Sequence, residues 1–266
     1  MNDLVQLASL APLLALAGAV INGLFGRSLR GNAPGIIASL AVAAGFVLSL
    51  IAFLGVRAGG AVRVRFGDFL VAGDLNIGLG FHFDQLSVLM MMIITGVGLL
   101  IHIYSIGYMQ GDEGFPRYFA QLNLFVAAML VLVMADSFPF MFVGWEGVGV
   151  CSFLLIGFWY RDLANASAGR KAFIVNRVGD FGFLLAMFLT YKAFGTLDIQ
   201  AVNAAAPSFA YGAAILTGIG LLYLLAAAGK SAQLPLHTWL PDAMAGPTPV
   251  SALIHAATMV TAGVYL

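Results

Sequence analysis

The chain has 266 residues, of which 61% are hydrophobic and only 9% are charged, and its formal net charge is zero. Soluble domains carry about 25% charged residues, so this composition indicates an integral membrane protein. The neutral balance gives no indication of a nucleic-acid partner. The single cysteine, Cys151, excludes an internal disulfide and a cluster held by several cysteines.

Apolar runs of about 20 residues, the length that crosses the ~30 Å hydrocarbon core of a bilayer, recur along the sequence. Seven complete candidate spans lie at residues 4–25, 35–56, 86–108, 119–135, 138–160, 173–191 and 211–239, and an unfinished eighth begins near Pro249. The first run lacks a basic leading region and a small-residue cleavage site, so we interpret it as a retained span. The sequence predicts an all-α polytopic bundle of about eight transmembrane helices and the front part of a longer protein.

The basic residues of the connecting loops alternate between the two ends of this predicted bundle. Six lie in the loops after spans one, three and five, and four lie at the other end. The six are Arg27, Arg30, Arg117, Arg161, Arg170 and Lys171, and the four are Arg57, Arg63, Arg65 and Lys192. The positive-inside rule therefore places the first set in the cytoplasm and the N-terminus outside.

The external loop at residues 57–84 contains a segment in which apolar and polar side chains alternate. The sequence Val62-Arg63-Val64-Arg65-Phe66 is typical of a strand with two different faces. We therefore predict a small external β-hairpin within residues 61–83.

The seventh span is too long for one helix, and Pro235 follows Lys230 by five residues. Proline lacks a backbone donor and clashes with the preceding turn. We favour a helix that is broken between Lys230 and Pro235; the alternative is a helix that ends at Gln233 and leads into a re-entrant turn. Irregular backbone at membrane depth persists only against protein or a water-filled cavity, so a break beside a buried lysine indicates an ion path.

Glu146 and Lys230 are lone charges within long apolar runs. A charge at bilayer depth costs at least ~2.5–3.5 kcal/mol on insertion scales, so such residues are usually functional. Glu146 is eight residues into its span and would lie about 12 Å deep. The structural alternatives are a protonated acid that bridges two helices and an ammonium paired with one carboxylate. We favour proton transfer for both, because a buried lysine readily gains and loses its proton.

Other polar residues of the spans carry two interpretations each. Arg177 and Asp180 are three apart and share a helix face, so they are either a snorkelling arginine with a local partner or a pair that breaks and reforms as a switch. His255 is either a proton relay or a hydrogen-bonding spacer. His237, in the predicted break, either caps free carbonyls or relays protons. We interpret His102, near a membrane edge, as interfacial.

The chain contains none of the common motifs for redox or nucleotide chemistry. GxGxxG, GxxxxGK[ST] and CxxC do not occur, and the histidines are not spaced as a haem or copper pair. We therefore expect no cofactor and no metal site in this chain. If the chain serves a redox enzyme, we expect it to move ions and not to carry out the redox chemistry.

Several sequence blocks together resemble the subunit L family of bacterial respiratory complex I, the NADH:quinone oxidoreductase, whose mitochondrial homologue is subunit 5. The blocks are residues 83–87, 100–109, 144–149 (GWEGVG), 154–159, 171–180 (ending NRVGD), 229–244 and 246–256. The last two are shared more widely with Mrp-type cation/proton antiporters. The resemblance covers the N-terminal part of that family.

The resemblance implies an organisation and a set of partners. Residues 1–110 would be lead helices and residues 111–266 the first of two inverted repeats, truncated at its C-terminus. The chain would hold no cofactor itself, with NAD, FMN, iron–sulfur clusters and quinone bound by partner subunits. It would lie as a multi-pass subunit in the bacterial inner membrane, against a neighbouring antiporter-like subunit of the membrane arm.

The resemblance also implies proton transfer for Glu146, Lys230 and His255, and a switching role for Asp180. Our hypothesis is that Lys230 loads a proton while Glu146 lies about 4 Å away, and passes it toward His255 when the pair opens. One alternative is a stand-alone Mrp-type Na⁺/H⁺ antiporter subunit that uses the same residues. Another is a purely structural membrane subunit.

Overall fold

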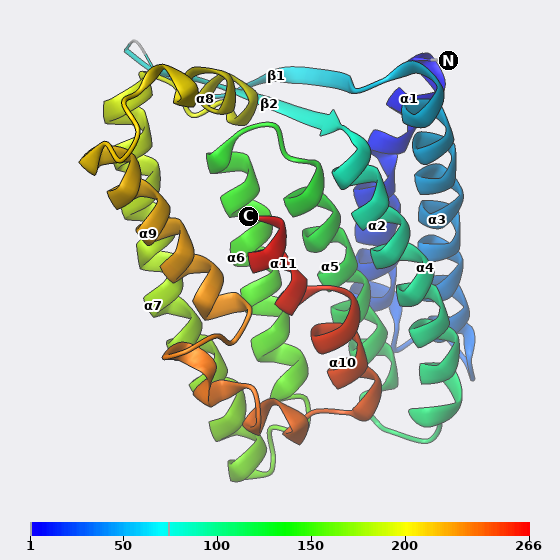
Figure 1. Cartoon of the computed structure of the whole chain (residues 1–266). Helices are drawn as coiled ribbons and strands as arrows, with labels where there is room; N and C mark the ends of the chain where they lie inside the picture. Colours follow the sequence, from blue (N-terminus) through cyan, green and yellow to red (C-terminus); the bar gives the residue numbers. More distant parts are fainter. Residues whose placement is uncertain (1, 74) are drawn as a thin grey trace.

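The computed structural model describes residues 2–73 and 75–266 as a helix bundle with a two-stranded hairpin across one end (Figure 1). The long helices are α2 (Ala11–Phe25), α3 (Ala33–Gly59), α4 (Gln85–Tyr108), α5 (Phe115–Met134), α6 (Phe138–Ile156), α7 (Leu163–Phe194) and α9 (Ala214–Lys230). The short helices are α1 (Asn2–Gln6), α8 (Ile199–Ala205), α10 (Thr248–Ala252) and α11 (Met259–Tyr265). Among the described residues, six helical stretches are long and apolar enough to cross a membrane, and α9 is a shorter apolar helix. The prediction of an all-α, multi-pass membrane protein is confirmed.

Helix α5 forms the centre of the bundle. It packs against α2, α3, α4 and α6, while α7 joins α6 to α9 on the far side. Leu122, Phe125, Val126 and Leu130 of α5 are fully buried. A helix whose apolar surface is mostly covered by its neighbours acts as the core element around which the others pack.

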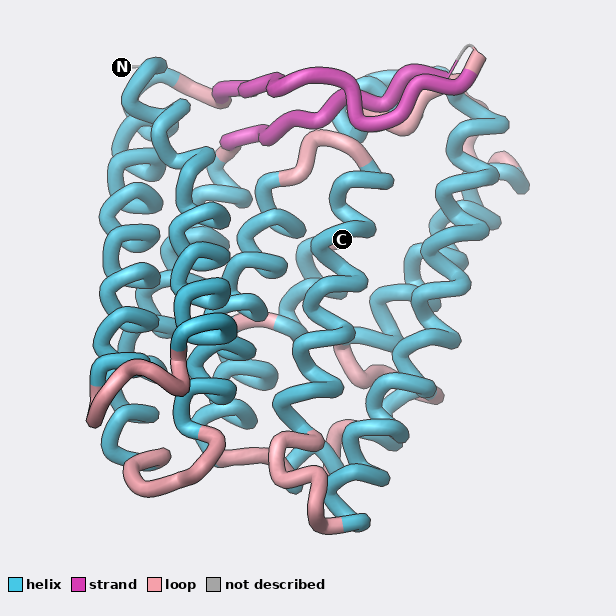
Figure 2. Tube along the Cα trace, turned by 180° about the vertical axis from the view of Figure 1, so that it is seen from behind, coloured by secondary structure: helices cyan, strands magenta, loops and turns pink. Residues whose placement is uncertain are grey.

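The two sets of loops lie at opposite ends of the bundle (Figures 1 and 2). The N-terminus and the hairpin lie at one end, and the loops after α2, α4 and α6, with their basic residues, lie at the other. Helix α7 is longer than the predicted span 173–191. The Asp162 carboxylate accepts a hydrogen bond from Ala164 N at 2.9 Å and caps the helix, which then continues through polar residues before it reaches the apolar stretch.

The predicted break in the seventh span is present, but it begins at Lys230 itself. Helix α9 ends there, Ala232 takes a left-handed φ of 50°, and Gln233 N donates to Ala228 O at 2.9 Å. This bond pattern is a Schellman termination with alanine where glycine is usual. The chain then continues in two 3-10 turns, η3 (Leu236–Trp239) and η4 (Asp242–Ala245), rather than in a second α-helix.

The predicted hairpin is confirmed as β1 (Val62–Ala72) paired antiparallel with β2 (Leu75–Phe83). Val62 lies opposite Phe83, so the pairing starts where α3 ends and α4 begins, and it extends from there across the bundle (Figure 1). The ring of Phe81 stacks on Phe140 of α6 at 5.5 Å between centroids and meets Phe66 edge-on at 5.3 Å. These aromatic contacts seat the hairpin on the end of α6.

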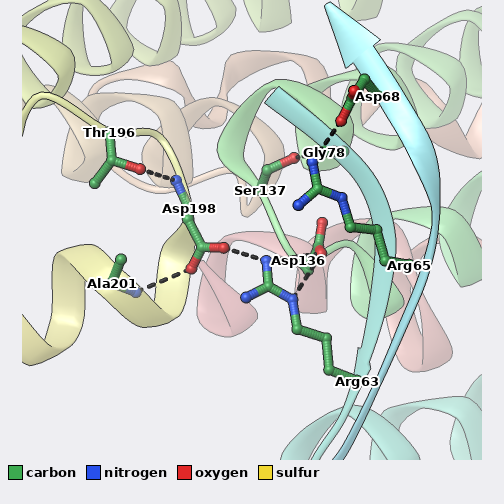
Figure 3. Close-up of polar contacts among 9 residues, drawn as sticks. All are labelled: Arg63, Arg65, Asp68, Gly78, Asp136, Ser137, Thr196, Asp198 and Ala201. Atoms are coloured by element: carbon green, nitrogen blue, oxygen red, sulfur yellow. Dashed lines mark hydrogen bonds and ion pairs between the residues drawn. The ribbon is translucent and has the colours of Figure 1, made fainter. Parts of the chain in front are cut away.

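One guanidinium ties three segments together at this end (Figure 3). Arg63 of β1 donates from Nε to the Asp136 carboxylate at 3.0 Å and also pairs with Asp198. Asp136 lies between α5 and α6 and is 1% exposed, and Asp198 caps α8 through Ala201 N. Partial burial disfavours the charged guanidinium, but hydrogen bonds and the charges of Asp198 and Asp136 outweigh it and raise the pKa of Arg63 above its ordinary value. We call this set the Arg63 bridge.

Replacing Arg63 tests the bridge. Arg63→Gln leaves the buried Asp136 carboxylate without its cation, which costs about 2 kcal/mol for a charge-assisted hydrogen bond to a buried group. We expect faster amide hydrogen exchange across residues 62–83, measured by mass spectrometry. Arg65→Gln is the matched control, because Arg65 pairs with exposed Asp68 and with no other carboxylate among the described residues, and such exposed pairs contribute about 0–1 kcal/mol. Equal exchange in the two variants would contradict the bridge.

Candidate functional site

Helices α7 and α9 approach each other closely where both carry glycine. A Cβ at Gly179 would lie 3.1 Å from the Cα of Gly229, so neither position has room for a side chain. Small residues allow this backbone approach in membranes. It brings Lys230, the last residue of α9, against α7. The carbonyl end of a helix also carries a partial negative charge, which favours a cation there.

Lys230 is paired with Asp180 of α7 in the interior. Its Nζ lies 3.4 Å from each carboxylate oxygen, and the two side chains are 1% and 4% exposed. Trp145 of α6 donates its indole N–H to Asp180 Oδ1 at 2.7 Å, and Nζ lies 5.8 Å from the centroid of the Trp145 ring. The ammonium is thus stabilised by one carboxylate and one aromatic face, and the carboxylate is shared between an amine and an indole.

A second ion pair lies beside the first. Glu146, next to Trp145 on α6, pairs with Arg177, which is three residues before Asp180 on α7. The Arg177 guanidinium also covers the ring of Phe173 at 4.5 Å. The Glu146 and Arg177 side chains are 21% and 41% exposed, so this pair is more accessible than the Lys230–Asp180 pair. Four predicted site residues are therefore brought together from three helices.

The expected pairing of Glu146 with Lys230 is wrong for this structure. Arg177 and Asp180 share a face of α7 that is turned toward α6 and α9, so Arg177 reaches Glu146 and Asp180 reaches Lys230. Arg177 and Asp180 are also not paired with each other among the described ion pairs. The arrangement is two ion pairs side by side, each formed between helices.

Two side-chain hydrogen bonds fix the end of α9 at the break. Trp239, fully buried on η3, donates its indole N–H to Gly229 O at 3.0 Å, and Ser231 Oγ donates to Val260 O of α11 at 2.6 Å. His237 was one candidate for this capping role, but it is exposed and none of the described hydrogen bonds involves its side chain. The cap is therefore Trp239, and a relay role for His237 stays a prediction.

His255 and His102 lie away from the two ion pairs. His255 falls in a π-helical turn, Leu253–Ala257, between α10 and α11, and its Nε2 is buried without a hydrogen-bond partner in the described structure. Its relay role stays a prediction. The interfacial interpretation of His102 is wrong: its ring is fully buried and lies 2.7 Å from both Gly98 O and Asn123 Oδ1.

Trp145 and Trp239 are site residues that the sequence reasoning missed. Both contact the groups that define the site, Asp180 and the end of α9. The available signal was that a buried tryptophan N–H needs an acceptor. Trp145 directly precedes Glu146, and Trp239 follows Pro235 within the break.

Two family models match the chain. The one described as NADH:quinone oxidoreductase/Mrp antiporter, TM, matches residues 135–266, and the one described as NADH-Ubiquinone oxidoreductase (complex I), chain 5 N-terminus, matches residues 69–119. Together they cover most of the chain. The chain belongs to this family of antiporter-like membrane subunits, as the sequence blocks predicted.

Within this family the chain is similar to NADH-quinone oxidoreductase subunit L. It is 52% identical to that of Mycobacterium tuberculosis H37Rv over 95% of this chain and 40% of the relative, and 56% identical to that of Escherichia coli K12 over 74% and 32%. The chain thus spans well under half the length of these relatives. In three dimensions it matches a chain of the Mrp complex from Dietzia sp. DQ12-45-1b with a TM-score of 0.83 and 31% identity, over 97% of this chain and 27% of that one.

Gly149 offers a steric test of the Lys230 position. An added Cβ would lie 2.6 Å from Lys230 Nζ, so Gly149→Ala pushes the ammonium away from Asp180. We expect a loss of about 1–3 kcal/mol, which outweighs the helix-propensity gain of about 0.5–1 kcal/mol. The measurement is the thermal unfolding midpoint of the purified protein.

Gly220→Ala on α9 is the matched control, because a Cβ there meets nothing within 4 Å. Its midpoint should equal or exceed the wild-type value. The penalty of Gly149→Ala should also shrink in a Lys230→Met, Asp180→Asn background. A full penalty in that background would mean that the clash does not act through the ammonium.

Proposed function

We propose that this chain forms the lead helices (residues 1–110) and first repeat (residues 111–266) of a proton-translocating subunit of NADH:quinone oxidoreductase. The observation that carries the proposal is the buried Lys230–Asp180 pair at the end of a broken helix, with the more accessible Glu146–Arg177 pair beside it. Interior charges are costly in a membrane and are retained where they move ions. The similarity to subunit L of two bacteria supports the same conclusion.

The Lys230–Asp180 contact is the proposed loading site for a proton. At 3.4 Å and an effective dielectric constant of ~20, the attraction of the carboxylate for the ammonium is about 5 kcal/mol. Closing the contact therefore holds the proton on Lys230, and opening it releases the proton. Moving one charge across 100 mV takes ~2.3 kcal/mol. The attraction within this contact is larger than that, so closing or opening the contact can bind or release a proton against such a potential.

We propose that Trp145 and the Glu146–Arg177 pair determine whether the Lys230–Asp180 contact is closed or open. Trp145 holds Asp180 when Lys230 does not, since it already donates to Oδ1 at 2.7 Å. Arg177 is on the same helix face as Asp180, so an Arg177 freed from Glu146 becomes an alternative partner for the carboxylate. When the proton leaves Lys230, one cation remains for two carboxylates, and Arg177 and the Trp145 indole are placed to stabilise Asp180 in that state.

His255 is the proposed next acceptor. Its π-helical turn is of a kind that occurs at functional sites, and its buried Nε2 has no protein partner in the described structure. α11, which follows this turn, packs against α9. A hydrated path between them would both satisfy Nε2 and carry the proton onward.

The energy source and the partners are also part of the proposal. The relatives are named as subunits of NADH-quinone oxidoreductase, so we assign NAD, FMN, iron–sulfur clusters and quinone to partner subunits. Other membrane-arm subunits, in particular a second antiporter-like subunit, would lie beside this one. The proposed location is the bacterial inner membrane, with the more basic end of the bundle in the cytoplasm.

A double variant separates function from structural support. Lys230→Met alone leaves Asp180 buried without its cation, which costs about 3–5 kcal/mol and should reduce assembly of the complex. Adding Asp180→Asn removes the uncompensated charge and should restore assembly. The proton-to-electron ratio of the double variant in proteoliposomes should nevertheless stay below the wild-type value. A double variant that both assembles and pumps normally would overturn the proposal and favour a purely structural subunit.

The second candidate is a stand-alone Mrp-type Na⁺/H⁺ antiporter subunit, which the match to the Dietzia Mrp chain favours. The two are distinguished in proteoliposomes. We expect proton movement only when NADH and quinone are supplied, and no acidification from a Na⁺ gradient alone. Sodium-driven proton exchange that is lost in Lys230→Met would instead assign the antiporter function.

A further inference from the structure

A cavity of about 780 Å³ lies at the end of the bundle opposite the hairpin, away from the ion-pair site. It is formed by the end of α2, the start of α5 and the connection between α6 and α7. Its lining includes Arg27, Arg117, Asn22, Gln121 and Tyr160. We infer that this cavity binds the phosphate-containing head group of a membrane phospholipid.

The charges of the cavity leave two guanidinium groups for a ligand. Its carboxylates are engaged within the protein. Asp112 accepts from the Trp159 indole at 3.0 Å and from Gly114 N at 2.7 Å, Glu113 lies 3.5 Å from Arg161, and Asp162 caps α7.

Arg27 and Arg117 have no carboxylate partner among the described ion pairs. Arg117 donates to Phe158 O at 3.0 Å and lies over the rings of Phe158 and Tyr160, at 4.5 and 5.0 Å, which fix its position. A positioned guanidinium with free N–H groups is suited to two oxygens of a phosphodiester.

Two amide side chains of the cavity lining have buried oxygens without a partner in the described structure. Asn22 is 1% exposed, and its amide N–H₂ donates to Pro34 O at 3.0 Å, but its Oδ1 is buried without a partner in the described structure. Gln121 Oε1 is likewise buried without a hydrogen-bond partner in the described structure. Buried polar atoms are rarely left unsatisfied. Both oxygens are covered by the protein around them, so the contacts open to a head group are those of the two arginines with its phosphate.

The surroundings favour a lipid over free phosphate. Leu24 and Phe25, which follow Asn22 on α2, are 73% and 59% exposed, and they offer an apolar surface to acyl chains. Trp159 and Tyr160 line the cavity, and such residues are typical of the membrane–water boundary. The lining is formally neutral, with three arginines and three carboxylates, so the two arginines without a carboxylate partner among the described ion pairs are the groups that would contact the phosphate of a head group.

The test uses the full-length subunit in its purified complex. A photoreactive phosphatidylglycerol and a photoreactive phosphatidylethanolamine are titrated into the delipidated complex, and crosslinks to residues 22–27 and 117–121 are quantified by mass spectrometry. Arg27→Gln should weaken crosslinking to these peptides about fivefold, the factor that corresponds to ~1 kcal/mol per basic residue. Arg27→Gln with Arg117→Gln should weaken it about 25-fold. Arg30→Gln, in the same loop but outside the cavity, is the matched control.

Arg27→Gln is the primary variant, because Arg27 makes no described contact that the fold needs. Unchanged crosslinking in that variant would overturn the inference. A second arm adds soluble glycerophosphoglycerol, glycerophosphoethanolamine or inorganic phosphate as competitor. We expect no competition at concentrations equal to those of the lipid; competition at equal concentration would assign the site to a free phosphate compound and would likewise overturn the lipid assignment.

Discussion

The ammonium of Lys230 sets the constraint on which the rest of this structure depends. It is 1% exposed at membrane depth, with one carboxylate, Asp180, in contact. A charge in that position is tolerable only if every stabilising contribution is present together. The glycine contact of α7 with α9, the carbonyl end of α9 and the face of Trp145 each supply one. The helix break follows from the same need, because it places the amine at a helix end and not at its middle.

The Glu146–Arg177 pair is placed so that a change in it also affects the Lys230–Asp180 pair. Glu146 and Trp145 are neighbours on α6, and their partners Arg177 and Asp180 are one turn apart on α7. A displacement between α6 and α7 therefore acts on the Glu146–Arg177 and Trp145–Asp180 contacts at once, and through Asp180 it reaches Lys230 on α9. Coupling of this kind is the property that a proton pump needs and that a passive anchor lacks.

Local pattern was enough to predict the long spans, the hairpin and the four charged residues that meet, but not the pairing of these charges or the part that Trp145 and Trp239 play. Alternation at residues 62–66 fixed the strand, and hydropathy fixed the helices. The choice of Asp180 over Glu146 as the partner of Lys230 depends on how α7 is rotated between α6 and α9, which is a property of packing. The Arg63 bridge joins residues more than 130 positions apart, as in the Arg63–Asp198 pair, and local sequence contains no signal for it.

The Arg63 bridge has a mechanical consequence for the interior. It fastens the start of α6, at Asp136, to the connection after α7, at Asp198 (Figure 3). At the opposite end the two helices are joined along the chain by residues 157–162. Both ends of the α6–α7 pair are therefore held, so bowing or twisting between the ends is the motion left to them. Glu146 lies about 12 Å along α6 from its first residue, between the two fastened ends, where such a bow displaces the helix most.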